Sequence, residues 1–520
     1  MQTNPDQTLY QWLEVHAQYR PDAPALISTE HVITYGELDA KVRKLATGLA
    51  DIGIGRGDVV AAQLPNCPEF IIAFLATAAR GAIFQTLHMP YRSHELSHLL
   101  GHGNAKVVVA LNTFKDINPV QEILGLLPDL ATLETVISVG QSTKGALSFA
   151  DLTSVKADPA AINDTQPDDN YLLLYTSGTT ASPKGVPHSY RGFLGNSWEI
   201  SRQLQFGGDD RILSLAPFSH LYGLMIVHMA LATGSANVLI PAFNPPTLVA
   251  DLKTHKPTAI FAAPAHFAPF IAKGGMAPEM FEQTRLVCLS GSTVAPKLAR
   301  NVDELLPRGK VIQLWGMSEL QAGAYGRPKD TLASRTETTG KASPGAKLRV
   351  VDGGGVQQGP ETEGALEIRG PSVFAGYLNN PQETDNSFTN DGWFKTGDLA
   401  IIAADGDLRL TGRTKEIINR GGVKYNPVDV ELLLAEMPQI QACTIVPLPD
   451  KTLGEKACLC VELQADQTLE LADVVAFLND RKIAKYKLPE RLEIFTTLPL
   501  TPTRKVMRGQ LISSLTQNKG

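Results

Sequence analysis

A short segment rich in hydroxyl groups and glycines, residues 175–185, combines side chains suited to binding polyphosphate. It reads YTSGTTASPKG and comes directly after the apolar run 171–174. Its threonines and serines can donate hydrogen bonds, its glycines allow unusual backbone conformations, and Lys184 adds a positive charge. Pro183 before the lysine and Gly185 after it break the GxxxxGK[ST] pattern, which disfavours a P-loop NTPase. Ordinary surface loops share this composition, so the segment alone leaves nucleotide binding and a plain loop as equal alternatives.

Four further motifs follow downstream in a fixed order. They are WGMSE at 315–319, WFKTGD at 393–398, GRTK at 412–415 and LPLTPTRK at 498–505. Together with the segment at 175–185, they resemble the signature motifs of the adenylate-forming superfamily. This superfamily contains acyl-CoA synthetases, the adenylation domains of peptide synthetases and firefly-type luciferases. Five motifs in family order over most of the chain make chance a poor explanation.

The resemblance implies a two-step reaction that uses ATP, Mg²⁺ and CoA. A carboxylate joins the α-phosphate of ATP, pyrophosphate leaves, and the CoA thiol then attacks the acyl-adenylate. Because two anions must meet, positioning and charge neutralisation must supply most of the catalysis. The residues expected to hold the β- and γ-phosphates are Thr176, Ser177, Gly178, Thr179, Thr180 and Lys184. Ala181 departs from the family pattern, because many relatives have glycine there.

The resemblance assigns the chemistry to Lys505, Glu319 and Thr176. Lys505 aligns with the family's C-terminal lysine, which reaches between the incoming carboxylate and the α-phosphate. Glu319 is expected to supply the carboxylate of a magnesium site, since Mg²⁺ commonly takes one or two protein carboxylates plus phosphate oxygens. Arg504 stands where many relatives carry glycine, so the turn before Lys505 is expected to differ. Without the resemblance, this Arg-Lys pair would be a solvated surface feature.

The remaining nucleotide contacts are expected around the ribose and the adenine. Asp398 matches the acidic residue that accepts hydrogen bonds from the ribose hydroxyls, and Arg413 matches its basic neighbour. Taken alone, Asp398 would be a turn residue and Arg413 a surface cation. The other residues that the resemblance places near the adenine, or on the loop beside it, are Ser292, Thr293, Trp315, Gly316, Met317 and Ser318.

The acyl pocket is expected to contain His220, Ala263 and Gly316. Relatives that activate α-amino acids carry an aspartate in the segment 217–224, which here reads PFSHLYGL without any acid. An unpaired buried ammonium would be costly, so the substrate is expected to lack an α-amino group. The mix of aromatic and small residues suits a compact aryl, alicyclic or medium-chain acid, although core packing explains these residues equally well.

Lys415 falls at the position of the family's hinge. In the family the C-terminal domain rotates there between two poses. One pose presents Lys505 for adenylation, and the other presents Gly421 and Gly422 while the thiol approaches. Without the resemblance, the two glycines are equally well a tight turn.

The elements that must position these residues follow an α/β pattern. Short β-rich runs, separated by helix-length segments, occur at 58–64, 107–111, 212–215, 259–263 and 286–290. This pattern predicts a large N-terminal domain of stacked α/β layers with parallel strands. After about residue 340, short strands and glycine turns indicate a small β-rich subdomain, followed by a small mobile α+β C-terminal domain. The predicted domains are 1–412, which binds ATP and the acid, and 413–520, with the hinge near Lys415.

The composition excludes several classes of protein. The 520 residues are 43% hydrophobic and 19% charged, as in a folded globular protein, and a net charge of −6 supplies no basic field for nucleic acid. Five scattered cysteines do not form a secreted disulfide framework, and Cys458 and Cys460 are expected to share a strand face rather than bind a metal. No secretory signal is visible, and the apolar run 70–79 is too short to cross a bilayer. A cytoplasmic enzyme with a buried helix at 70–79 is expected.

Three rival functions stay open at this point. A stand-alone adenylation enzyme that loads a non-amino carboxylic acid onto the phosphopantetheine of a carrier protein would share every motif, because CoA ends in the same thiol. A nucleotide-binding protein without turnover is suggested only by the departures at Ala181 and Arg504. The third, a luciferase-like oxygenase, has the least support, because nothing in the sequence asks for oxygen chemistry.

Overall fold

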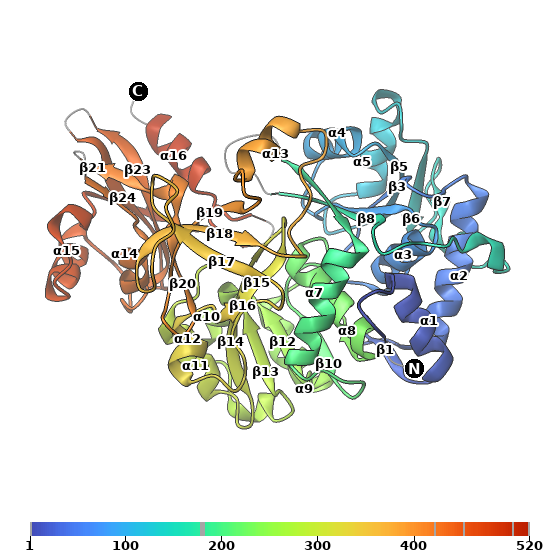
Figure 1. Ribbon diagram of the computed structural model, residues 1–520, viewed down its shortest axis with the longest axis horizontal. Coiled ribbons are helices and arrows are strands. Elements are labelled where there is room, and N and C mark those ends of the chain that lie inside the picture. The colour runs from blue at the N-terminus through green and yellow to red at the C-terminus, as the bar shows by residue number, and fades with distance from the viewer. Residues whose placement is uncertain (1–2, 177–182, 421–422, 451–452, 502–503, 518–520) are drawn as a thin grey trace.

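The computed structural model describes residues 3–176, 183–420, 423–450, 453–501 and 504–517. Two large α/β units form one part of the molecule, and a β-rich unit separates them from the C-terminal elements at the far end (Figure 1). The α/β fold class expected from the alternating β-rich runs is confirmed.

The first α/β unit is built on a seven-stranded sheet with the order β7-β6-β5-β3-β4-β8-β9. Neighbouring strands run parallel except β8 and β9, which form an antiparallel pair at one edge. The strands are β3 (Val59–Gln63), β4 (Ile83–Thr86), β5 (Ala105–Leu111), β6 (Thr135–Val139), β7 (Leu147–Ser148), β8 (Asn170–Tyr175) and β9 (Gly185–Ser189). The predicted runs at 58–64 and 107–111 are therefore strands of one sheet.

The second α/β unit is built on a nine-stranded sheet with the order β16-β15-β14-β13-β12-β10-β11-β1-β2. Its central strands are parallel, and antiparallel pairs occur at both edges. The strands are β1 (Pro24–Ile27), β2 (Val32–Thr34), β10 (Arg211–Ser214), β11 (Ala236–Val238), β12 (Ala259–Ala262), β13 (Leu286–Leu289), β14 (Lys310–Met317), β15 (Gln321–Tyr325) and β16 (Lys341–Ala342). The three other predicted β-rich runs are β10, β12 and β13.

Helices cover both sheets. They are α1 (Leu9–Tyr19), α2 (Tyr35–Asp51), α3 (Pro68–Ala79), α4 (Ser93–His102), α5 (Pro119–Leu126), α6 (Phe149–Leu152), α7 (Tyr190–Gln203), α8 (Leu221–Thr233), α9 (Pro245–His255), α10 (Pro264–Lys273), α11 (Pro296–Glu304) and α12 (Leu332–Glu337), with short 3₁₀ turns η1 (Leu127–Asp129), η2 (Pro159–Ala161) and η3 (Pro278–Phe281). The predicted helix at 70–79 is α3, which is buried along its whole apolar run. Helices α3 and α8 are apolar on every face because each packs between layers of the core.

The β-rich unit is a four-stranded antiparallel sheet with the order β17-β18-β19-β20. Its elements are β17 (Lys347–Val351), β18 (Glu363–Arg369), β19 (Phe394–Ile402), β20 (Leu408–Arg413) and the helix α13 (Pro381–Ser387). Aromatic side chains such as Phe374 and Phe394 share one hydrophobic cluster with Trp315 of β14, which joins this sheet to the nine-stranded one.

The C-terminal unit has its own sheet and its own hydrophobic core. Its elements are η4 (Thr414–Glu416), β21 (Ile418–Arg420), β22 (Val423–Tyr425), α14 (Val428–Leu434), β23 (Ile440–Asp450), β24 (Gly454–Leu463), α15 (Leu471–Asp480), η5 (Lys485–Lys487), β25 (Arg491–Phe495) and α16 (Arg508–Gln517). Cys458 and Cys460 lie two apart on β24 and are buried in one cluster with Leu498 and Leu511, as the alternating pattern predicted.

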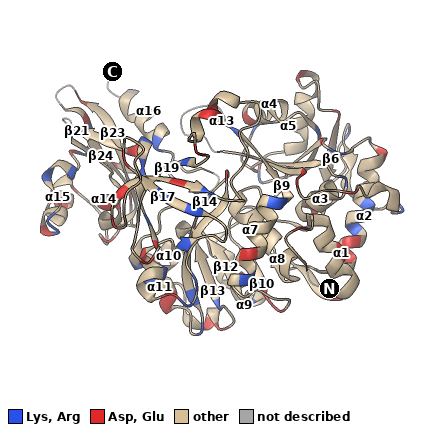
Figure 2. Cartoon of the chain, in the orientation of Figure 1, with Lys and Arg blue, Asp and Glu red and all other residues tan. Residues whose placement is uncertain are grey.

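The charged side chains are spread over all units rather than gathered into one basic stripe (Figure 2). No helix in the described part of the chain is long and apolar enough to cross a membrane.

Candidate active site

The phosphate-binding segment connects β8 to β9 at the edge of the seven-stranded sheet. The apolar residues of β8 are buried in the core, and the chain then leaves the sheet at Thr176. The backbone N–H of Thr176 donates to the Lys184 carbonyl (3.1 Å), and the Lys184 N–H donates to the Thr176 hydroxyl (3.3 Å). These two bonds close the base of the loop. Four predicted phosphate ligands, Ser177, Gly178, Thr179 and Thr180, lie outside the described residues, as does Ala181.

Lys184 is held by two groups of the β-rich unit. Its ammonium forms an ion pair with Glu383 of α13, and it lies 4.6 Å from the centre of the Tyr377 ring. A cation over an aromatic face is attracted by the ring quadrupole. The lysine is only half-buried, so an incoming phosphate can compete with Glu383 for its charge.

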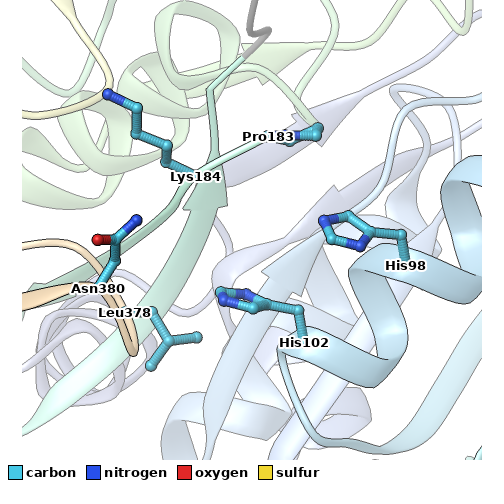
Figure 3. Close-up of a pocket in the computed structure, with 6 residues that line it drawn as sticks. All are labelled: His98, His102, Pro183, Lys184, Leu378 and Asn380. Atoms are coloured by element: carbon cyan, nitrogen blue, oxygen red, sulfur yellow. The ribbon is translucent and has the colours of Figure 1, made fainter. Parts of the chain in front are cut away.

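A cavity of about 140 Å³ lies next to Lys184. Figure 3 shows His98 and His102, one turn apart on α4, facing it from one side, with Lys184 and Asn380 on the other. The two imidazole rings stack at 6.0 Å, and His102 Nδ1 is 3.0 Å from the Tyr175 hydroxyl. Burial, and then the neighbouring His98, lower the pKa of His102. The cavity therefore offers hydrogen-bonding groups with little fixed charge besides Lys184.

Glu319 is a buried carboxylate, 8% exposed, just after β14. The Tyr377 hydroxyl donates to its Oε1 (2.9 Å), and among the described residues no lysine or arginine lies within ion-pair distance. Burial raises the pKa of Glu319, while the Tyr377 bond and the more distant charges of Lys184 and Arg413 lower it. A buried acid that lacks a bonded cation suits a divalent metal ion. The described residues hold no cluster of three or more potential metal ligands, so Mg²⁺ would need phosphate oxygens as its other ligands.

Asp398 and Arg413 form an ion pair across the β-rich sheet. They are directly opposite in the antiparallel register of β19 and β20, and Arg413 Nε donates to Asp398 Oδ1 (2.7 Å). Trp315 Nε1 donates to the other carboxylate oxygen (2.9 Å). The Asp398 side chain is 10% exposed, but that of Arg413 is 49% exposed. The pair therefore combines a fixed, largely buried carboxylate with an accessible guanidinium, and the charge of Asp398 raises the pKa of Arg413.

Lys505 of the C-terminal unit reaches this same region. Burial among protein atoms lowers the pKa of Lys505, the charge of Arg413 lowers it further, and the carboxylates of Asp398 and Glu319 raise it. The charge of Lys505 also lowers the pKa of His220. The Lys505 side chain is nevertheless exposed to solvent. Lys505 therefore lies within electrostatic reach of Asp398, Arg413 and Glu319 while its side chain stays open to water.

The predicted pocket residues His220 and Ala263 line one small cavity of about 20 Å³. His220 is the N-cap of α8, where its Nδ1 accepts a hydrogen bond from the Tyr222 N–H (3.2 Å). Burial, and then the charge of Lys505, lower the pKa of His220 well below its ordinary value. The ring is therefore neutral at physiological pH. Gly316, the third predicted pocket residue, is not part of this cavity lining.

The remaining predicted nucleotide residues lie at the end of β14 and after β13. Gly316 sits in a bulge between β14 and β15, where a Cβ would lie 1.8 Å from the Gln321 carbonyl, so only glycine fits. Met317 ends β14, and the carbonyl of Ser318 bonds His188 Nε2 (2.7 Å). Ser292 and Thr293 follow β13 and are exposed.

The predicted hinge residue Lys415 lies in η4, immediately after β20. It is exposed, and the preceding Thr414 hydroxyl donates to the Gly397 carbonyl (3.1 Å). The chain at this point leaves the four-stranded sheet and enters the C-terminal one. Gly421 and Gly422, expected near the thiol, lie outside the described residues.

Sequence reasoning missed Glu383, Tyr377 and the two histidines of α4. Tyr377, Glu383 and His102 are distant in sequence from their partners Glu319, Lys184 and Tyr175, so only the fold reveals these contacts. The sequence could have marked Tyr377 and Glu383 as candidates near the site, because residues 374–384 lie a short way before the WFKTGD motif.

Comparison with known proteins gives a consistent answer. Residues 13–378 match the family of AMP-binding enzymes, and residues 429–505 match the AMP-binding enzyme C-terminal domain. The chain is 30% identical to the medium-chain fatty-acid–CoA ligase of Escherichia coli, over 99% of this chain and 92% of that protein. It is also 30% identical to the oxalate–CoA ligase of Arabidopsis thaliana, over 96% and 97%.

The fold agrees with solved structures over its full length. ATP-bound MatB from Rhodopseudomonas palustris superimposes with a TM-score of 0.88 and 25% identity, over 99% of this chain and 100% of that one. The chain therefore belongs to the AMP-binding enzyme family, and it is an AMP-forming acid–thiol ligase that uses ATP, Mg²⁺ and CoA.

Proposed function

We propose that this enzyme converts a carboxylic acid without an α-amino group to its CoA thioester, with the charged residues of the cleft dividing the work. Lys505 bridges the acid and the α-phosphate, Lys184 and Thr176 bind the β- and γ-phosphates, and Glu319 holds Mg²⁺. The carrying observation is that three charged residues of the large unit, Arg413, Asp398 and Glu319, all act on the pKa of Lys505 of the C-terminal unit, and that Arg413 and Asp398 form an ion pair.

We propose that Asp398 and Arg413 bind the nucleoside. Asp398 is held by Trp315 and Arg413, and the small exposed part of its carboxylate can accept hydrogen bonds from the ribose hydroxyls. Arg413, half exposed, can bind a phosphate or the ribose without losing its partner. The adenine would lie between this pair and the loop of Ser292 and Thr293. When bound, Mg²⁺ neutralises phosphate charge beside Glu319.

The acid is proposed to enter beside His220 and Ala263. The pocket lining holds no carboxylate that could pair an ammonium, which supports acids without an α-amino group. A compact aryl, alicyclic or medium-chain acid stays the proposed range. Two relatives that are equally identical to this chain in sequence are named for medium-chain fatty acids and for oxalate. Sequence identity to relatives therefore does not indicate which acid this enzyme uses.

We divide the chain into domains 1–412 and 413–520 that rotate about Lys415. The change of sheet between β20 and β21 and the separate cores on either side support this boundary. Rotation would withdraw Lys505 after adenylation and admit the CoA thiol, with Gly421 and Gly422 near its path. We also propose that the enzyme acts in the cytoplasm.

The test is release of AMP and pyrophosphate by the purified protein with ATP and Mg²⁺, across aryl, alicyclic, short-chain and medium-chain acids, each with and without CoA. Multiple turnovers only with CoA, and only with acids that lack an α-amino group, are the expected result. Pyrophosphate release that stops after one turnover despite CoA would instead indicate a carrier-protein acceptor. A preference for α-amino acids would refute the pocket assignment.

A further inference from the structure

Arg504 occupies a conformation that glycine adopts more easily. The residue stands in the turn before Lys505, with a φ of 63° in the left-handed region. The turn is closed from both sides: the Arg504 N–H donates to the Thr501 carbonyl (2.8 Å), and the Thr501 N–H donates to the Lys505 carbonyl (2.8 Å). A strained arginine held at a functional site suggests that its side chain is used there.

Arg504 is part of the lining of the cavity assigned to the acid. It lines this cavity together with His220, Ala263 and His266, and its guanidinium carbon lies 5.2 Å from the centre of the Phe243 ring. The Phe243 and His266 rings are themselves in contact, with centres 4.5 Å apart. The guanidinium therefore lies over Phe243, whose ring contacts His266 of the cavity lining.

The histidines around it are neutral. Burial, and then the charge of Arg504, lower the pKa of His266 to about 3. Burial and the charge of Lys505 lower that of His220. Among the described residues, no carboxylate lies within ion-pair distance of Arg504. Arg504 and Lys505 thus bring two successive positive charges to the acid. Lys505 faces the proposed nucleotide site and has carboxylates nearby, whereas Arg504 lines the pocket and has none within ion-pair distance among the described residues.

We infer that Arg504 binds a second anionic group on the substrate, so that this enzyme selects carboxylic acids that carry another carboxylate or a sulfonate. This inference rests on the proposed assignment of the cavity beside His220 as the acyl pocket. A monocarboxylic acid would place apolar atoms against the guanidinium and strip its water without replacing it, which disfavours such acids. A second anion would instead form charge-assisted hydrogen bonds with the guanidinium.

The position of Arg504 also links acid recognition to the pose of the C-terminal domain. The residue belongs to the same turn as Lys505, whereas His220, Ala263 and His266 belong to the large domain. An acid with two anionic ends would touch both domains at once. Binding of such an acid therefore favours the closed pose in which Lys505 reaches the cleft.

The test compares matched acid pairs in the pyrophosphate-exchange reaction: succinate with butyrate, adipate with hexanoate, and terephthalate with p-toluate. We expect kcat/KM to be larger for the diacid of at least one pair by roughly 10- to 150-fold, the range that a charged hydrogen bond supplies. The variants R504Q, which removes the charge, and R504G, which also relieves the left-handed φ, are expected to bring this ratio close to one. R504K should keep part of it. R481Q removes an exposed arginine of the same domain and should leave the ratio unchanged.

The ratio separates specificity from a structural role. If R504Q slows both acids of every pair by the same factor, Arg504 merely shapes the turn for Lys505, and the inference is wrong. Faster turnover of the monocarboxylic acid in all pairs would overturn the inference and leave the proposed function standing. AMP release with no acid at all, with or without CoA, would overturn both.

Discussion

Replacing Lys505 by alanine is expected to slow acyl-adenylate formation by roughly 100- to 1000-fold and to spare the second half-reaction. A unit charge acting at about 4 Å through an effective dielectric constant of about 20 is worth about 4 kcal/mol, or about three powers of ten in rate. Solvent reaches the Lys505 side chain, which screens this interaction and places the effect below that bound. Loss of one positioned donor from an enzyme site has a similar magnitude.

The stability of the protein should not change. Among the described residues, Lys505 has no ion pair, and its side chain supports no core cluster. The free energy of unfolding of K505A should therefore stay within about 0.5 kcal/mol of the wild-type value. An unfolding experiment thus separates lost chemistry from lost structure.

Two assays resolve the half-reactions. Exchange of labelled pyrophosphate into ATP reports adenylation, and formation of the thioester from synthetic acyl-AMP and CoA reports the second step. K485A, which removes an exposed lysine of the same domain, serves as the control. Equal loss of both half-reactions in K505A would refute the division of roles, and so would unchanged exchange.

The pH dependence tests the environment of Lys505. Its pKa is lowered from the ordinary value of 10.5, chiefly by burial, so the ammonium loses its proton at a lower pH than an exposed lysine does. In the free enzyme, kcat/KM for adenylation should fall on the alkaline side below pH 10.5. The variant K505R should lose this limb, because arginine stays charged there.

Two further variants address the carboxylates of the cleft. E319Q should lower activity by roughly 100-fold or more through loss of the metal ligand. The ligand-free E319Q protein should be as stable as the wild type at pH 7, or more stable, because burial raises the pKa of Glu319 and its charged form therefore costs stability above that pKa. Lower stability of E319Q in thermal unfolding would contradict this reasoning. In D398N, the new amide N–H faces either the Trp315 N–H or the Arg413 N–H, so one of these donors loses its acceptor. Calorimetry should show ATP binding at least about 10-fold weaker, and the free energy of unfolding should fall by about 1.5–3 kcal/mol. D391N, at an exposed acid, is the control, and equal ATP affinity in D398N would exclude the ribose role.

The sequence predicted the local structure well, because periodic burial determines strands and helices locally. The runs at 107–111 and 286–290 are strands, the run at 70–79 is a buried helix, and Cys458 and Cys460 share a strand face. The fold class follows from the alternation of such elements. The boundary at 412 and the hinge at Lys415 stay predictions.

The candidate site could be predicted only as a set of motifs. Trp315, Asp398 and Arg413 come from three separate motifs, and nothing in their spacing says that one carboxylate accepts from both partners. The ion pair of Lys184 with Glu383 and the bond from Tyr377 to Glu319 join residues far apart in the chain. Contacts of this kind depend on how sheets and helices pack together.

Residue identity and order alone determined the family, the layered α/β class and the absence of an acid in the segment 217–224, because motifs and periodicity are properties of the linear chain. Only the tertiary structure decided that Arg504, a departure from the family pattern in a turn, reaches the pocket of His220 and His266. Arg504 lies in the C-terminal unit and the two histidines lie in the nine-stranded α/β unit, so the distance between them depends on how these two units pack together. A one-dimensional pattern carries no information on that packing, whereas burial, charge and distance in the folded chain do.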